Sequence, residues 1–201
     1  MRNIIGLLAL AALPLLHGCA AVAVGGAAAT GVVMGEDRRT VGTITEDQGI
    51  EFKASSRVGE KFPNTHLNFT SYNRMLLLTG EVPEEAQRGR IEQALAKIEN
   101  VKSVVNELVV SGNSSSTSRA NDLQLGLKVK ASFVEAKDVF ANATKVIVER
   151  ANVYLMGRVT EREAVRAAEL ASQVPGVAKV VRVFELISEE ELAKLMPAPA
   201  K

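Results

Sequence analysis

The sequence predicts an α+β fold in which one α-β-β-α-β unit occurs twice. Apolar stripes of helical period alternate with short runs rich in Leu and Val. The two halves of the chain repeat the same order of turn, strand, glycine, helix and strand, and Gly80 and Gly157 occupy matching places 77 residues apart. Each unit is therefore expected to form a three-stranded sheet with one face covered by two helices.

The first 18 residues are typical of a secretory signal peptide. Arg2 precedes an apolar run from Ile4 to Leu16, and this run of 13 residues is too short to cross a bilayer as a helix. The only cysteine, Cys19, follows directly after Gly18. The segment resembles a bacterial lipobox, which implies acylation of Cys19; a plain signal with an incidental cysteine is the alternative. Residues 19–45 are then the lipidated N-terminus and its tether.

The residue after the cysteine indicates whether the lipoprotein stays in the inner membrane or reaches the outer membrane. It is Ala20 rather than Asp, and in Gram-negative lipoproteins an Asp there tends to mean retention in the inner membrane. The resemblance to these lipoproteins therefore implies an outer-membrane protein held by acyl chains, with the periplasmic face favoured over the cell surface. Two or three chains anchor a protein firmly, because each buried CH₂ contributes about 0.8 kcal/mol.

Composition excludes several classes of function. Without residues 1–18 the chain has 23 basic and 23 acidic residues, so bulk charge predicts no nucleic-acid binding. After residue 18 the chain has one histidine, His66, and one cysteine, Cys19, which is expected to carry the lipid. This inventory argues against a His/Cys metal site, a disulfide or Cys–His chemistry. His66 is expected to be a strand or turn residue. No nucleophile elbow, phosphate loop or dinucleotide motif occurs. The sequence predicts neither an enzyme nor a cofactor.

The first unit is predicted over residues 46–111. A helix opens it, two strands follow around a turn at 72–74, and the second strand ends at Gly80. Pro83 is expected to open the second helix, and 104–110 is expected to form a buried strand. The apolar stripes of the two helices are Ile50, Ala54 and Val58, and Ile91, Ala94, Leu95 and Ile98.

The second unit is predicted over residues 120–187 and repeats this order. Its second strand ends at Gly157, Thr160 and Glu163 form a capping box for the next helix, and 177–186 closes the unit. Residues 112–119 are a polar linker, expected to be a flexible joint between two packed units. Residues 188–201 are expected to be a C-terminal helix and tail, with a further capping box at Ser188 and a docked apolar side.

The repeated unit resembles the BON domain. The resemblance rests on the strands that run into glycine, LLLTGEV and VYLMGRVTEREA, and on GEDRRTVG at 35–42. Behind a lipobox, the pair is similar to dual-BON outer-membrane lipoproteins. This similarity implies no enzymatic activity; it implies binding of anionic phospholipid by the first helix of the second BON domain, outer-membrane integrity, association with the division site and an influence on the cell-wall amidases.

The helix over 121–134 carries two apolar stripes. Leu125, Val129 and Phe133 form the stripe expected to face the sheet. The other side is expected to meet phospholipid, and its residues are Leu123, Gln124, Leu127, Lys128, Lys130, Ala131 and Val134. The alternative is that this side packs against the first unit or the C-terminal helix. Gln124 stands where similar proteins carry a tryptophan.

Two further functions remain open at this point. A protein-interaction adaptor would use the second apolar stripe to contact an envelope-assembly factor or a protein that regulates cell-wall amidases. A structural module joining the membrane to peptidoglycan is the third possibility, although no dedicated binding motif supports it.

Overall fold

A computed structural model describes residues 37–59, 61–62, 65–136 and 141–195. Residues 36–201 form one compact unit, and all the elements named below belong to it. The predicted signal peptide, Cys19 and most of the tether lie outside the described residues. No helix in the described ranges combines the length and apolar character needed to cross a membrane.

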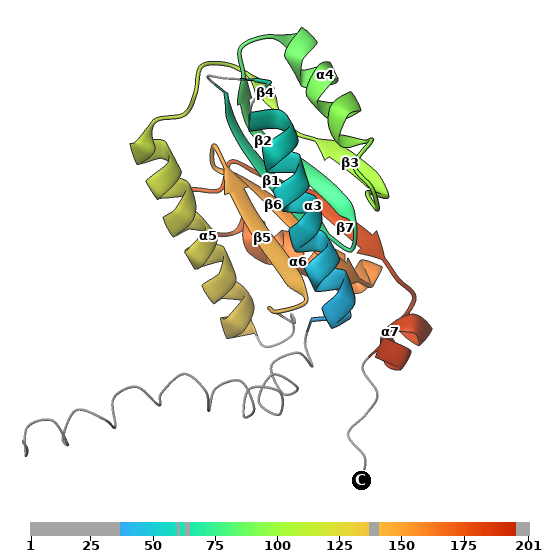
Figure 1. Cartoon of the computed structure of the whole chain (residues 1–201). Coiled ribbons are helices and arrows are strands. Elements are labelled where there is room, and N and C mark those ends of the chain that lie inside the picture. The colour runs from blue at the N-terminus through green and yellow to red at the C-terminus, as the bar shows by residue number, and fades with distance from the viewer. Residues whose placement is uncertain (1–36, 60, 63–64, 137–140, 196–201) are drawn as a thin grey trace, which may run out of the picture. The chain divides into compact units, whose positions relative to one another are not determined.

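The first BON-like unit contains two helices and one mixed sheet (Figure 1). β1 runs antiparallel to β2, whereas β3 and then β4 run parallel to β2 along its other edge. The elements are α3 (Val41–Gly59), β1 (His66–Tyr72), β2 (Met75–Val82), α4 (Glu85–Leu95), β3 (Ser103–Asn106) and β4 (Val109–Val110).

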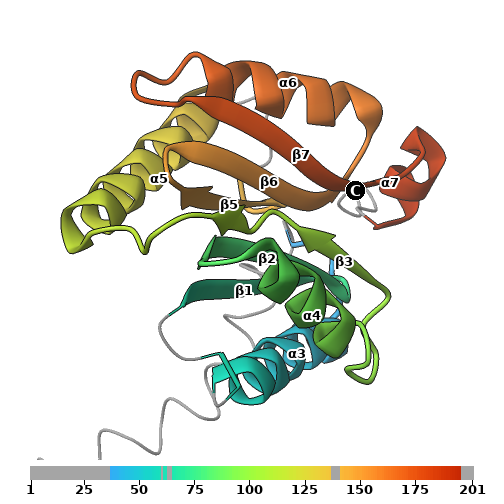
Figure 2. The same ribbon diagram turned by 90° about the horizontal axis from the view of Figure 1, so that it is seen from above.

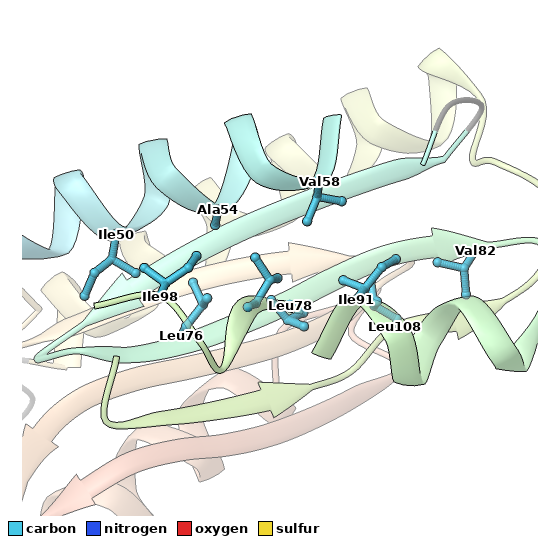
Figure 3. Packing of buried hydrophobic residues seen from close by; sticks show 10 residues of the cluster. Ile50, Ala54, Val58, Leu76, Leu78, Val82, Ile91, Ile98 and Leu108 are labelled. Atoms are coloured by element: carbon cyan, nitrogen blue, oxygen red, sulfur yellow. The ribbon is translucent and has the colours of Figure 1, made fainter. Parts of the chain in front are cut away.

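The core of the first unit lies between its sheet and its two helices. Figure 3 shows Ile50, Ala54 and Val58 of α3 pointing toward Leu76 and Leu78 of β2, with Ile91 contributed by α4. Of the predicted stripe residues, Ala94 is half-buried and the others are buried here, namely Ile50, Ala54, Val58, Ile91, Leu95 and Ile98. Burial of a large aliphatic side chain contributes about 1.5–3 kcal/mol, so this seam holds the helices on the sheet.

The second unit repeats the arrangement with a more regular sheet. β5 is antiparallel and β7 parallel to the central strand β6, and β7 pairs with β6 over its full length. The capping box predicted at Thr160 and Glu163 is present at the start of α6. The elements are α5 (Ser116–Ala136), β5 (Thr144–Glu149), β6 (Asn152–Val159), α6 (Glu161–Ser172), β7 (Lys179–Leu186) and α7 (Glu189–Leu195). The predicted α+β fold of two such units is confirmed.

The two sheets pack face to face, with helices on their outer sides (Figure 2). Alternate residues of β2 point to opposite faces, so Leu76 and Leu78 meet the helices while Leu77 meets the other sheet. The intersheet cluster contains Tyr72, Leu77, Tyr154, Met156 and Val183. Each sheet is therefore covered on both faces, by helices and by the other sheet; the sequence predicted the helix-covered face and two packed units, without saying which faces would meet.

Three helices do not begin where the sequence indicated. α3 begins at Val41, within the predicted tether, and α5 begins at Ser116, within the predicted linker. α4 begins after Pro83, at Glu85. Pro83 therefore lies before the helix and its N-cap residue Glu84, and is not its first residue as predicted.

The predicted buried strand 104–110 is interrupted and partly exposed. Leu108 is buried in the core, its N–H donates to the side chain of Asn106, and this local bond separates β3 from β4. Val109 and Val110 of β4 are exposed.

The C-terminal helix also differs from its prediction. The N–H of Glu191 donates to the Ser188 hydroxyl, as a capping box requires. The Glu191 carboxylate, however, pairs with Arg158 at 2.5 Å. α7 buries no residue, so its predicted apolar docking is wrong for the residues described.

Candidate functional site

Helix α5 presents a second apolar face outside the core of its own unit. Leu125, Val129 and Phe133 are buried against the second sheet, as predicted. On the other side, Leu123, Leu127 and Val134 leave 69%, 61% and 65% of their surface exposed. A helix needs only one apolar side to cover a sheet, so the fold does not account for these three side chains.

All seven residues predicted for this side are exposed. Lys128, Lys130 and Ala131 lie among the three apolar side chains, and Gln124 lies beside Leu123. In the described part of the chain, neither the first unit nor α7 covers them. We name this surface, Leu123, Gln124, Leu127, Lys128, Lys130, Ala131 and Val134, the α5 face.

The corresponding helix of the first unit exposes a different surface. Phe52 is 73% exposed on α3 and lies between charged and small polar residues. Its exposed neighbours are Lys53, Ser55, Ser56 and Arg57. Val41 is exposed as well, at the start of this helix. No row of aliphatic side chains comparable to the α5 face occurs along α3.

A cavity of about 340 Å³ lies beside the α5 face. Leu123, Leu127 and Lys130 line it from α5, while His66 and Glu149 line it from β1 and β5. The cavity therefore joins the α5 face to a cluster of titratable side chains from both units.

That cluster consists of His66, Glu81 and Glu149. His66 Nδ1 lies 3.0 Å from Glu81 Oε2 and 3.7 Å from Glu149 Oε1. Burial opposes ionisation of Glu81, but the Ser114 N–H and His66 outweigh it and lower the pKa of its carboxyl group. Burial raises the pKa of Glu149, although Asn68 donates a hydrogen bond of 2.7 Å to its carboxylate. The sequence did not predict this cluster, because its members are far apart in the chain.

The two matching glycines lie where strands approach closely. A Cβ atom on Gly80 would stand 2.0 Å from the carbonyl oxygen of His66, and one on Gly157 would stand 2.5 Å from that of Ala143. Gly80 also has φ of +116°, in the region that favours glycine. The two glycines therefore allow the close approach of paired strands.

An aspartate on the first helix of each unit holds the turn between the first two strands. Asp47 accepts hydrogen bonds from the N–H groups of Asn73 and Arg74, each at 2.8 Å. Asp122 accepts from the N–H groups of Arg150 and Ala151 at 2.9 and 2.8 Å. All four turn residues have positive φ. The sequence analysis did not identify this pair of aspartates, although they occupy similar places in the repeat.

Arg38 and Arg39, just before α3, form ion pairs that hold residues 37–40 against the folded domains. Arg38 donates two hydrogen bonds to Glu163, at 2.8 and 2.7 Å, and both side chains are buried. Burial opposes ionisation of Glu163, but Arg38 and the Thr160 N–H lower the pKa of its carboxyl group. Arg39 pairs with Asp37 and Asp47 and lies 4.0 Å from the centre of the Tyr72 ring. This segment is therefore part of the fold, whereas the sequence placed it in the tether.

The repeated fold and its glycine-ended strands are those of BON domains, and the chain belongs to the BON family. The BON domain matches twice, over residues 46–112 and 121–187. The outer membrane lipoprotein DolP of Haemophilus influenzae is 35% identical over 175 residues, which cover 86% of this chain and 90% of that protein. The 21 kDa hemolysin of Actinobacillus pleuropneumoniae is 27% identical over 154 residues, covering 75% of this chain and 79% of the relative.

Solved structures give a weaker likeness. The match to CdsD, a structural protein of the type III secretion system of Chlamydia trachomatis, has a TM-score of 0.30 and 16% identity. It covers 78% of this chain and 99% of the CdsD chain. At this score the likeness carries no argument about function.

The similarity to the outer membrane lipoprotein confirms the predicted localisation. The chain is a lipid-anchored protein of the outer membrane with a role in the cell envelope. Acylation at Cys19 itself remains a prediction, because that residue lies outside the described residues.

Proposed function

We propose that this chain is a non-enzymatic lipoprotein, anchored through Cys19, that binds anionic phospholipid with the α5 face and maintains outer-membrane integrity at the division site. The observation that carries the proposal is the exposure of Leu123, Leu127 and Val134 on a helix whose opposite side is already buried. An apolar helix side of this kind enters the boundary between headgroups and acyl chains by about 5–10 Å.

The two lysines of the α5 face supply the preference for anionic lipid. Lys128 and Lys130 are exposed in the same stretch of α5 as Leu127 and Ala131. Near a negatively charged membrane each lysine contributes about 1 kcal/mol, and salt weakens the attraction. Gln124 replaces the interfacial tryptophan of similar proteins, so the leucines must supply most of the apolar contact.

Sedimentation with vesicles tests the proposal. Residues 36–201 contain the three described hydrophobic clusters, so this part carries the whole described core without the acyl anchor. We expect it to sediment with phosphatidylglycerol or cardiolipin vesicles and to stay in solution with neutral ones. Leu127→Glu should abolish sedimentation, because it places a charge in the apolar contact.

The chain offers a matched control. Phe52→Glu alters the more exposed apolar residue of the equivalent helix α3. We expect Phe52→Glu to bind vesicles like the unmodified chain. Equal loss for both variants would contradict the assignment to α5. No binding by the unmodified protein would leave the acyl anchor as its membrane contact and favour the alternative, an adaptor whose α5 face contacts an envelope-assembly or amidase-regulating protein.

A further inference from the structure

The fold brings one histidine and two glutamates from both BON domains to one point. His66 and Glu81 are direct partners in the β1–β2 ladder. Glu149 ends β5 and reaches them because the two sheets pack face to face. One nitrogen or oxygen from each side chain lies within 4.8 Å of the others.

The cluster has an excess of buried negative charge. The Glu81 and Glu149 side chains are 0% and 6% exposed. Glu81 Oε1 accepts no hydrogen bond, and its nearest cation, Arg150, is 3.5 Å away and 40% exposed. Asp122 adds a further nearby negative charge. A buried carboxylate is costly unless a cation or proton compensates its charge.

We propose that His66 Nδ1, Glu81 and Glu149 bind one divalent transition-metal ion, with Zn²⁺ the ion that suits this mixture of nitrogen and oxygen ligands. Zinc bonds of about 2.0–2.2 Å in tetrahedral geometry place neighbouring ligand atoms about 3.3–3.5 Å apart. The distances from His66 Nδ1 to Glu81 Oε2 and Glu149 Oε1, 3.0 and 3.7 Å, fall on either side of this spacing. His66 Nδ1 is therefore already close to the spacing from each carboxylate that a zinc ion requires.

The surroundings suit a metal site. Asn68 donates to Glu149 Oε2, and the Ser114 N–H donates to Glu81 Oε2, so second-layer hydrogen bonds orient both carboxylates. The cavity lined by His66 and Glu149 gives the ion a path from solvent and room for a water ligand. Composition argued against a site made of several His and Cys residues, but this site needs one histidine because two carboxylates supply its other protein ligands.

The ion would join the two BON domains. His66 and Glu81 belong to the first domain and Glu149 to the second. Binding to the folded state alone stabilises that state by mass action. We therefore expect Zn²⁺ to raise the thermal unfolding midpoint of the chain.

Metal titration of the mature acylated chain in detergent micelles tests the proposal. The protein is purified without a histidine tag, treated with a chelator and titrated with Zn²⁺. We expect one ion per chain and a higher unfolding midpoint. Glu149→Gln should weaken binding at least tenfold, because it replaces a charged ligand by a neutral one of the same size. Glu99→Gln, at a carboxylate that is 78% exposed, is the matched control and should bind normally.

A spectroscopic measurement keeps the test decisive if Glu149→Gln fails to fold. His66 is the only histidine after residue 18, so its ring signals in the NMR spectrum of the mature chain need no further assignment. Zn²⁺ should shift these signals at one equivalent of metal. Unshifted signals, absence of stoichiometric binding, or a folded Glu149→Gln variant that binds like the unmodified chain would overturn the proposal.

Discussion

The first helices of the two BON domains have the same core side and different outer sides. Ile50, Ala54 and Val58 of α3 are buried like Leu125, Val129 and Phe133 of α5, at the same spacing of four residues. Their outer sides share no such pattern. The core side must fit a sheet that both domains possess, whereas the outer side is constrained only by what it meets in solution or at a membrane.

The closing strands differ in a second way. β7 pairs with β6 through eight register positions from Asn152 to Val159, whereas Leu108 interrupts the equivalent strand of the first domain. The duplicated fold therefore tolerates local changes where a side chain can satisfy the freed backbone group. Functional differences between the domains are then expected on their outer helices and at their shared boundary.

The largest difference in stability is expected at the starts of α4 and α6. Arg38→Met leaves the buried Glu163 carboxylate without its guanidinium and should reduce the free energy of unfolding by about 3–5 kcal/mol. The start of α4 lacks a side-chain cap, so Glu84→Ala should change stability by less than about 0.5 kcal/mol. Urea unfolding of residues 36–201 measures both.

A double variant and a pH series check the cause. Adding Glu163→Gln to Arg38→Met should recover part of the loss, because it removes the buried charge. The folded-state pKa of Glu163 is lowered below the ordinary value of 4.5. Its contribution is therefore present above pH 4.5 and is lost as the pH falls through the lower folded-state pKa. A pH dependence unchanged by Glu163→Gln would contradict this explanation.

The matching glycines should respond unequally to one methyl group. Gly80→Ala and Gly157→Ala each create a clash with a backbone oxygen, but only Gly80 also has a positive φ. We expect the loss of unfolding free energy at Gly80 to exceed that at Gly157 by roughly 1–3 kcal/mol. Chemical denaturation measures the difference, and an equal or larger loss at Gly157 would contradict this order, because Gly80 has both the closer contact and the positive φ.

The turn aspartates should differ by a smaller amount. Asp47 also accepts from the Ser71 hydroxyl at 2.6 Å and from Arg39, whereas Asp122 holds its turn through the N–H groups of Arg150 and Ala151. Asp47→Ala should therefore cost about 1 kcal/mol more than Asp122→Ala. Thermal unfolding of the two variants decides this, with equal losses counting against a role for the additional contacts.

The smallest change in stability is expected at the lysines of the α5 face. Lys128→Glu with Lys130→Glu should leave the unfolding free energy within about 0.5 kcal/mol of its starting value, because both side chains are exposed. The pair should nevertheless abolish sedimentation with anionic vesicles. Lys53→Glu with Arg57→Glu on α3 is the matched control. Normal vesicle binding by the Lys128/Lys130 variant would show that other groups recognise the lipid.

The sequence by itself determined the repeated unit, the core stripes and the second apolar side of the helix over 121–134. These features follow from periodicity, which depends on local geometry alone. The capping box at Thr160 belongs to the same class, because its partners are three residues apart.

Only the tertiary structure decided which residues of the two units come into contact. The run Met75 to Leu78 is apolar at every position because one of its sides meets the helices and the other meets the second sheet. Arg38 pairs with Glu163, which is 125 residues away in the sequence. His66 lies near Glu149 only because the two sheets pack together. Periodicity records which side of an element is apolar, but which distant charge lies opposite depends on the register and packing of the whole fold.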